Sequence, residues 1–275
     1  MDDYEIDLLI YSVIRKYKAG VDRQKLLEQI ERLAFFNTIV VYKKRTSLAL
    51  LSLDVLTNRH TVKTFFQKIE ENIKEVMMQP DFHEAMKNVG RANGYYGWNS
   101  IRYFMFEYEQ HLKLKTKSER EKLRWVDEDS DGESYELDYR SVEHVYPQSA
   151  KDAYWRNAFS KYDTKQKNKL KNSLGNLLPV SSPKNSSLSN KSFTLKKGDA
   201  KAQVGYRYGC FSEIQVSEEG DWNAISIVKR GIYLLNFMEK RWRIPLGDFQ
   251  RKLEILGVEF VLEVENIAAS DFADS

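Results

Sequence analysis

Between residues 143 and 185 the chain carries side chains whose types suit metal-assisted hydrolysis, namely an acid, a histidine and two asparagines. Glu143 and His144 are adjacent, and Asn176 and Asn185 follow them with a step of nine residues between the two asparagines. Such hydrolysis needs a base that deprotonates a water molecule and a positive charge near the leaving oxygen. An imidazole with a reference pKa of about 6.5 is largely neutral at pH 7 and can act as the base. Carboxylate and amide oxygens are ligands that Mg²⁺ accepts.

Each of these residues also has an ordinary structural explanation when it is taken alone. A single His144 is typical of a hydrogen-bonded core histidine. Asn176 follows Gly175 and suits a turn, and Asn185 suits the first turn of a helix. Only the combination, with Pro147 three residues after the histidine, favours a catalytic site over these explanations.

The charge distribution around these residues is uneven. The chain of 275 residues has a formal net charge of only +3. Residues 151–201 nevertheless contain twelve lysine and arginine residues and three acidic ones, a local net charge of +9. Residues 127–138 contain seven acidic residues and no basic ones. The basic segment is a candidate surface for a polyanion, and its alternative is a solvated lysine-rich loop.

The elements that must position the four side chains follow from local patterns. Residues 139–145 predict a short strand that Pro147 ends, and residues 174–180 predict a second strand. Pro183 and the serine and asparagine residues after it predict a turn into a helix, with Asn185 in its first turn. The acidic stretch that precedes the first strand reads as an exposed loop.

The flanking regions are predicted to be mostly helical. Apolar residues recur at three- and four-residue steps through much of the first 115 residues, and Asp221 is a candidate cap for a long helix through Trp242. The apolar tail at residues 255–264 predicts a further strand. His60, His83 and His111 are isolated, and we expect structural or surface roles for them.

The four residues together resemble the HNH, or ββα-metal, nuclease site in its His-Asn-Asn version. Residues 143–149 resemble the acid-His-x-x-Pro element of that family, and the step from Asn176 to Asn185 matches the step from its second-strand asparagine to its metal-holding helix residue. A similar element and the same step occur in the HNH domain of RNA-guided CRISPR nucleases. The resemblance implies a strand, turn, strand and helix core over residues 139–197.

A narrower resemblance connects the chain with the nuclease half of the GmrSD-type modification-dependent restriction and phage-defence proteins. In that family a helical region with an Arg-Tyr helix precedes the nuclease motif, and Arg102-Tyr103 and Glu109 fit that place. The motifs that carry the resemblance are Ser141 to Gln148, Trp155, Leu174 to Val180, Asn185 to Asn190, Phe193 and Lys196-Lys197.

The resemblance implies a role for each residue. His144 would be the general base and Asn176 would fix the turn that aims the imidazole. Glu143 and Asn185 would hold Mg²⁺ or Mn²⁺ together with the substrate phosphate, and Asn190 is an alternative to Asn185 on the metal side. Activity would fall below about pH 6 as the histidine is protonated. The lysines predicted to contact DNA phosphates are Lys184, Lys191, Lys196 and Lys197.

Three departures from the family patterns stand out. Glu143 occupies the place where many HNH proteins have aspartate, and cysteine knuckles are absent because Cys210 is the only cysteine. The nucleotide-binding half of GmrSD-type proteins, with its Asp-Gly-Gln-Gln-Arg-like motif, is also absent. We therefore expect a nuclease fragment of a longer protein or a subunit whose nucleotide-binding sensor lies on another chain.

The sequence therefore predicts an α+β protein with a helical region at residues 1–120 and an HNH-type nuclease region with C-terminal helices at residues 121–275. The predicted function is a metal-dependent DNA endonuclease or nickase that restricts foreign or modified DNA. The alternatives are an inactive DNA-binding or partner-docking module and an RNA-cleaving toxin. One cysteine, an N-terminus without a signal-peptide pattern and the absence of a long apolar stretch predict a cytoplasmic protein without a membrane anchor.

Overall fold

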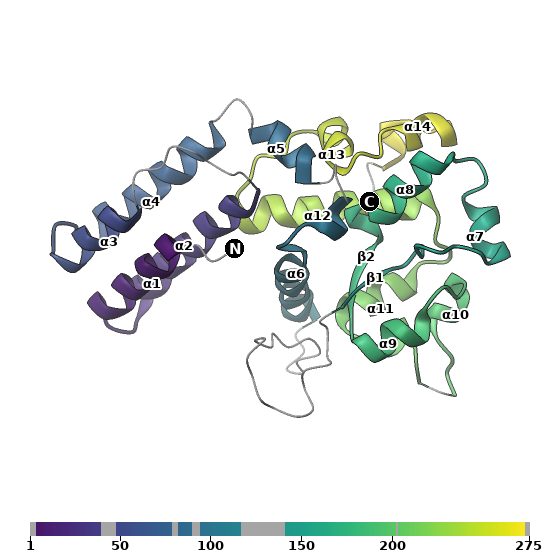
Figure 1. The fold of residues 1–275 in the computed structure, drawn as a ribbon, viewed down its shortest axis with the longest axis horizontal. Coiled ribbons are helices and arrows are strands. Elements are labelled where there is room, and N and C mark those ends of the chain that lie inside the picture. Colours follow the sequence, from purple (N-terminus) through teal and green to yellow (C-terminus); the bar gives the residue numbers. More distant parts are fainter. Residues whose placement is uncertain are drawn as a thin grey trace. The chain divides into compact units, whose positions relative to one another are not determined.

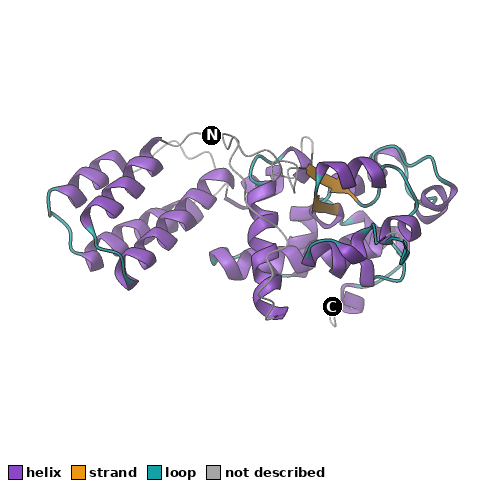
Figure 2. Cartoon of the chain, turned by 90° about the horizontal axis from the view of Figure 1, so that it is seen from below, coloured by secondary structure: helices purple, strands orange, loops and turns teal. Residues whose placement is uncertain are grey.

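The computed structural model describes residues 4–39, 48–78, 82–89, 94–116, 141–201 and 203–272. Within these ranges the regular structure is mostly helical, and two short strands form a small antiparallel sheet (Figure 2). The α+β prediction is thereby confirmed. The chain divides into two compact units, Met1–Met86 and Lys87–Ser275. The boundary predicted at residue 120 lies outside the described residues.

The first unit is built mainly from four helices (Figure 1). Helix α1 packs against α2 and α3, and α2 packs against α4. In α1 the buried residues Ile6, Leu9 and Val13 recur at three- and four-residue steps, as the sequence pattern predicted. The bounds of these helices are α1 (Tyr4–Lys16), α2 (Val21–Ile39), α3 (Leu48–Leu56) and α4 (Val62–Met77).

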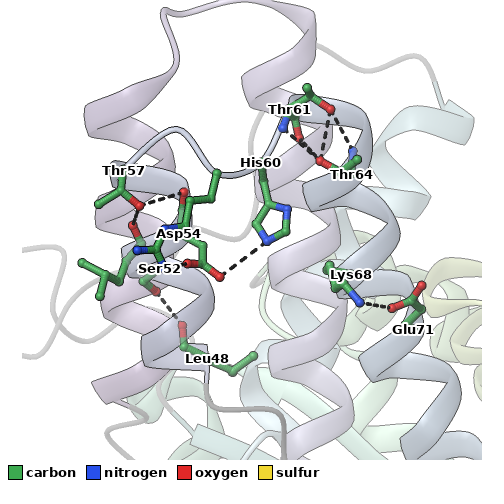
Figure 3. Close-up of polar contacts among 11 residues, drawn as sticks. Leu48, Ser52, Asp54, Thr57, His60, Thr61, Thr64, Lys68 and Glu71 are labelled. Atoms are coloured by element: carbon green, nitrogen blue, oxygen red, sulfur yellow. Dashed lines mark hydrogen bonds and ion pairs between the residues drawn. The ribbon is translucent and has the colours of Figure 1, made fainter.

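Short-range polar contacts hold the turn between α3 and α4 (Figure 3). Thr61 caps α4 and forms a reciprocal capping box, in which the Thr64 backbone N–H donates to Thr61 Oγ1 at 3.2 Å and the Thr61 backbone N–H donates to Thr64 Oγ1 at 2.9 Å. On the α3 side, Arg59 donates to Asp54 at 3.2 Å, and His60 Nε2 lies 3.6 Å from the same carboxylate. These contacts hold His60 in the turn between α3 and α4, where its role is structural.

The second unit holds the sheet and the remaining helices. Helix α5 (Phe82–Val89) spans the division between the units. The other helical elements are η1 (Gly94–Gly97), α6 (Ile101–Thr116), α7 (Ala153–Ala158), α8 (Thr164–Asn172), η2 (Leu174–Asn176), α9 (Ser182–Leu188), α10 (Phe193–Lys197), η3 (Tyr206–Tyr208), α11 (Phe211–Glu218), α12 (Ala224–Trp242), α13 (Phe249–Leu256), α14 (Phe260–Glu265) and η4 (Ala269–Phe272).

The sheet pairs the two strands that the sequence predicted. Strands β1 (Ser141–His144) and β2 (Leu177–Val180) are antiparallel, with His144 opposite Leu177 and Glu143 opposite Leu178. Every residue of β2 is buried. Helix α9 packs against β1, and α6 and α11 pack against β2. Because β2 leads directly into α9 and α9 packs against β1, the two strands and α9 form one strand, strand and helix unit.

Helix α12 supports the turn before β2. Three aromatic rings, those of Phe104, Phe237 and Trp242, lie with centroids 5.7 to 5.9 Å apart and join α6 to α12. The cap of α12 is Asn223, whose Oδ1 accepts from the Ser226 backbone N–H at 3.1 Å, and not Asp221 as predicted. The side chain of Asp221 accepts a hydrogen bond from another element instead.

A buried carboxylate connects α6 to α11. Glu109, which the family resemblance singled out, is 1% exposed. Its oxygens accept from the backbone N–H groups of Phe211 and Ser212 at 2.5 and 2.9 Å, in the first turn of α11. Negative charge is stabilised at this end of a helix, where backbone N–H groups have no partner within the helix. Glu109 therefore fixes the position of α11 behind β2.

The prediction of a strand at residues 255–264 is wrong. Gly257 adopts a left-handed conformation with φ of 68° and ends α13, and Asn266 does the same with φ of 54° for α14. Val258 and Val261 are buried three residues apart, which is a helical spacing. The apolar run is short, and such a run does not distinguish a strand from a buried helix by itself.

In the described part of the chain, no helix is long and apolar enough to cross a membrane.

Candidate functional site

Glu143 and His144 end strand β1, and their environments differ. Successive side chains of a strand point to opposite faces. His144 contacts groups from η1, α8 and the segment after β1, whereas Glu143 contacts α10 and η3. Both residues are buried, with exposures of 8% and 5%.

His144 is held by two amide side chains and an aromatic ring. Its Nε2 lies 3.3 Å from Asn172 Oδ1 and 2.8 Å from Gln148 Nε2. Gln148 also donates to Asn172 Oδ1 at 2.9 Å, so the three side chains form a closed triangle. The ring of Tyr96 lies 4.5 Å from the imidazole, centroid to centroid. The sequence interpretation did not identify Asn172, Gln148 or Tyr96 as site residues.

Burial lowers the pKa of His144 to about 4, and the charges of Lys196 and Lys171 act in the same direction, while the contact with Asn172 opposes them. The imidazole is therefore neutral at pH 7 and able to accept a proton. The pH at which this group becomes charged moves from the value near 6 expected from the sequence to about 4. The reason is desolvation, which residue type alone does not reveal.

The imidazole proton can lie on either ring nitrogen, and the two positions use the surrounding contacts differently. With the proton on Nε2, the ring donates to Asn172 Oδ1 and keeps the lone pair of Nδ1, but the Gln148 amide nitrogen, which is also a donor and lies 2.8 Å from Nε2, must then turn aside. With the Gln148 amide donating to Nε2, the proton lies on Nδ1. Among the described residues Nδ1 has no hydrogen-bond partner, and only the first arrangement leaves an acceptor nitrogen for a water molecule.

Glu143 forms a buried ion pair with Lys196. The Nζ atom of Lys196 lies 2.5 Å from Glu143 Oε1 and also donates to the backbone oxygens of His144 and Val145 at 3.0 and 3.2 Å. Burial raises the pKa of Glu143 and lowers that of Lys196, and their mutual attraction opposes both shifts. Tyr206 Oη donates to the same carboxylate oxygen at 3.3 Å. Lys196 is 0% exposed, so this placement does not fit the predicted contact with DNA.

Asn176 holds the turn between the strands through both ends of its amide. Its Nδ2 donates to the backbone oxygens of Tyr146 and Lys171 at 3.0 and 2.8 Å. Its Oδ1 accepts from the Tyr146 backbone N–H at 2.8 Å and from Trp222 Nε1 at 3.0 Å. The residue is 0% exposed. This geometry suits the predicted role of fixing the segment that follows His144, without contact with a substrate.

Helix α12 approaches this turn closely because residue 175 is glycine. A Cβ atom at Gly175 would lie 1.9 Å from the backbone oxygen of Ile227. Arg230 Nη1 donates to the backbone oxygens of Gly175 and Leu177 at 2.8 and 2.7 Å, on both sides of Asn176. Arg230 and Trp222 are thus support residues that sequence reasoning missed, since they lie 54 and 46 positions from Asn176 and carry no local signal.

Asn185 is the middle residue of α9, the helix that packs on β1. Its side chain is partly exposed and makes no hydrogen bond to a described residue, which leaves its amide oxygen available as a ligand. Asn190 lies beyond the end of α9 and is exposed. The placement therefore favours Asn185 over Asn190 as the partner of a residue on β1.

The donors suit Mg²⁺ or Mn²⁺ in kind, because Glu143 offers a carboxylate and Asn185 an amide oxygen. Glu143 Oε1 already accepts from Lys196 and Tyr206, and the His144 backbone N–H also stabilises the carboxylate, so an ion would have to use Oε2. Among the described residues, no three histidine, cysteine, aspartate or glutamate side chains gather into a metal-binding group. An ion at this site would need water and substrate oxygens to complete its coordination.

The other lysines predicted to contact DNA lie in different environments. Lys184 Nζ lies 2.8 Å from Glu213 Oε1, a fully buried carboxylate, so its charge is paired. Lys197 is partly exposed and donates to the backbone oxygen of Glu219 at 2.5 Å. Lys191 is exposed. Of the four predicted lysines, Lys191 and Lys197 therefore lie where DNA can reach them.

Comparison with known proteins returns one family. The family model described as GmrSD restriction endonucleases, C-terminal domain, matches residues 79–237, which is more than half of the chain. The matched range contains β1, β2, α8 and α9, and all the residues that surround His144 and Asn176. Neither a curated protein nor a solved structure matches this chain.

Proposed function

Because this chain belongs to the family of GmrSD restriction endonucleases through their C-terminal domain, we propose that it hydrolyses phosphodiester bonds of DNA as a divalent-metal-dependent endonuclease or nickase of the HNH type. The proposal places this activity in the cytoplasm, in the restriction of foreign or modified DNA. A nucleotide-binding sensor domain or subunit, which the family resemblance implies, is a partner within the same proposal.

The observation that carries the proposal is the state of His144. It is a neutral imidazole at the end of β1, with Nε2 held by Asn172 and Gln148 and with Nδ1 lacking a partner among the described residues. A general base must be unprotonated at the working pH and fixed in direction. Both conditions agree with a base that takes a proton from the attacking water.

The other residues have supporting tasks in this proposal. Asn176 keeps the segment after β1 in place, and Lys196 holds the Glu143 carboxylate at the end of the strand. Glu143 Oε2 and the Asn185 amide oxygen would hold Mg²⁺ or Mn²⁺. When bound, the ion supplies positive charge at the leaving oxygen of the phosphodiester.

A plasmid-nicking assay tests the proposal. Supercoiled plasmid is incubated with the wild-type protein and with His144→Ala in Mg²⁺ or Mn²⁺, and duplex DNA, single-stranded DNA and RNA are digested in parallel. We expect the wild type to nick or linearise the plasmid and His144→Ala to lose at least 100-fold in rate while it still folds and binds DNA, since general base catalysis contributes roughly 10²- to 10⁴-fold.

Other outcomes would overturn the proposal. Cleavage that persists in excess EDTA would exclude the metal-dependent mechanism. Binding of DNA without cleavage under any metal would indicate an inactive binding or docking module. Cleavage of RNA alone would indicate an RNA-cleaving toxin.

A further inference from the structure

Part of the positive charge of residues 151–201 is already neutralised in the interior. Lys184 pairs with Glu213, and Lys196 pairs with Glu143. Helix α8 carries four more lysines within nine residues, Lys165, Lys167, Lys169 and Lys171, and it contains no acidic residue. Its cap, Asp163, uses its carboxylate to accept from the Gln166 backbone N–H at 2.8 Å.

The four lysines lie in two pairs, Lys165 with Lys169 and Lys167 with Lys171, on the two flanks of the polar face of α8. Successive residues of an α-helix turn by about 100°, which places Lys165, Lys167, Lys169 and Lys171, with Asn168 and Asn172, on an arc roughly 200° wide. Leu170, the buried residue of the helix, lies opposite this arc. Lys165, Asn168 and Lys169 are exposed, and Lys167, Lys171 and Asn172 are partly exposed. The outer surface of α8 therefore presents only amide and ammonium groups on these positions.

The ammonium groups of three of these lysines are not neutralised by an ion pair with a described residue. Lys165, Lys167 and Lys169 make no ion pair with any residue that the structure describes. Lys171 donates to the backbone oxygen of Gln148 at 2.8 Å, and both burial and the charge of Lys167 lower its pKa. Like charges four residues apart destabilise a helix. The negative charge of an anionic partner would offset this repulsion between the lysines.

The lysine surface is continuous with the candidate site. Asn172 is the last residue of α8, and its Oδ1 contacts Nε2 of His144. Asn168, Lys169 and Asn172 also line a cavity of about 290 Å³ beside the turn between α13 and α14. Glu259 lines the same cavity, which makes its interior electrically mixed. An extended polyanion would therefore follow the outer arc of the helix.

We propose that the exposed arc of α8, chiefly through its exposed lysines Lys165 and Lys169, binds the phosphate backbone of duplex DNA and leads one strand toward His144. This inference rests on the proposed function, because it assigns the substrate-binding surface of the same site. Ammonium groups at this spacing contact phosphates without reading base sequence. The surface explains the local charge better than Lys184 and Lys196 do, because those two ammonium groups are already paired.

The test compares two double variants that each remove two exposed charges. Lys165→Gln/Lys169→Gln changes α8, and Lys229→Gln/Lys240→Gln changes exposed lysines of α12 that make no ion pair with a described residue. Glutamine is nearly as good a helix former as lysine, so both variants should fold. Fluorescence anisotropy with labelled duplex DNA in EDTA measures binding without cleavage, at salt concentrations from 50 to roughly 200 mM.

We expect the α8 variant to bind more than 10-fold more weakly at the lowest salt concentration. The slope of log affinity against log salt should fall by about 1.8, because each lost phosphate contact removes about 0.9. The α12 control should keep the wild-type slope. An equal loss in both variants, or an unchanged slope in the α8 variant, would overturn the inference. If the wild type binds DNA through α8 and cleaves no DNA with any metal, the proposed function fails and the binding surface remains.

Discussion

Replacement of Lys196 by methionine separates two roles of this residue: a buried cation that pairs with Glu143, and the predicted contact with a DNA phosphate. Its ammonium group has three acceptors in the interior, Glu143 Oε1 and the backbone oxygens of His144 and Val145. Methionine keeps most of the side-chain length and removes the charge. The variant therefore leaves the 94% buried Glu143 carboxylate without its cation.

The magnitude follows from this burial. Removal of one partner of a buried ion pair costs about 3–5 kcal/mol, since the remaining charge loses both its partner and solvation. With a urea m value of about 3 kcal/mol/M for a unit of this size, the midpoint should fall by roughly 1–2 M. The double variant Lys196→Met/Glu143→Gln removes both charges, and we expect it to be about 2 kcal/mol more stable than the single variant.

Tryptophan fluorescence during urea unfolding provides the assay. All five tryptophans lie after residue 86, so the signal reports the unit that contains the ion pair. The control is Lys191→Met, an exposed lysine whose replacement should change stability by about 0.5 kcal/mol or less. If Lys196→Met unfolded at the wild-type midpoint and weakened DNA binding as Lys191→Met does, the structural role would be refuted and the phosphate-contact role restored.

Three further predictions concern the surroundings of His144. Burial lowers the pKa of His144 to about 4. As the pH falls from 7 to 5, this histidine therefore becomes protonated in the unfolded chain while it is still neutral in the folded chain. The free energy of unfolding, measured in EDTA, should fall by about 2 kcal/mol through this group. An identical pH dependence in His144→Gln would contradict this. Gly175→Ala should lose roughly 3 kcal/mol or more, because its Cβ would overlap backbone atoms of α12, whereas Gly220→Ala, with nothing within 4 Å, should stay within about 0.5 kcal/mol in the same urea assay. Asn176→Ala should unfold at least 2 kcal/mol more easily, since it leaves buried backbone groups and Trp222 Nε1 unpaired, and equal stability with lost cleavage would instead indicate a direct catalytic role.

Both strands, α9 and many of the flanking helices were predictable because their signals are local, whereas α7 and α8 lie in a lysine-rich segment that was expected to be a connection. Apolar spacing marked the helices, and Pro147 and Pro183 marked the end of one element and the start of another. The strand predicted at residues 139–145 is observed at Ser141–His144, and its partner is Leu177–Val180. The strand prediction for residues 255–264 was wrong because a short apolar run forms a strand only where another strand offers it hydrogen bonds. These residues pack as helices instead.

The charge prediction shows the limit of residue type. Lys191 and Lys196 look alike in the sequence, but one is exposed and the other is fully buried beside Glu143. Burial is decided by the packing of α10 against β1, which lies about 50 residues earlier in the chain, and against η3, which lies about ten residues later. A count of lysines therefore located a basic region but did not show which ammonium groups are free.

By itself, the sequence determined the order of the chemical groups: an acid and a histidine at the end of a strand, and two asparagines nine residues apart. Hydrogen-bonding geometry within one turn or hairpin depends on neighbouring residues, so these features could be predicted. Tertiary structure alone decided that Asn172 and Gln148 hold the imidazole, that its pKa lies near 4 and that Lys196 forms an ion pair with Glu143. Desolvation and ion pairing depend on groups brought together from distant segments, and their energies appear only once the chain has packed.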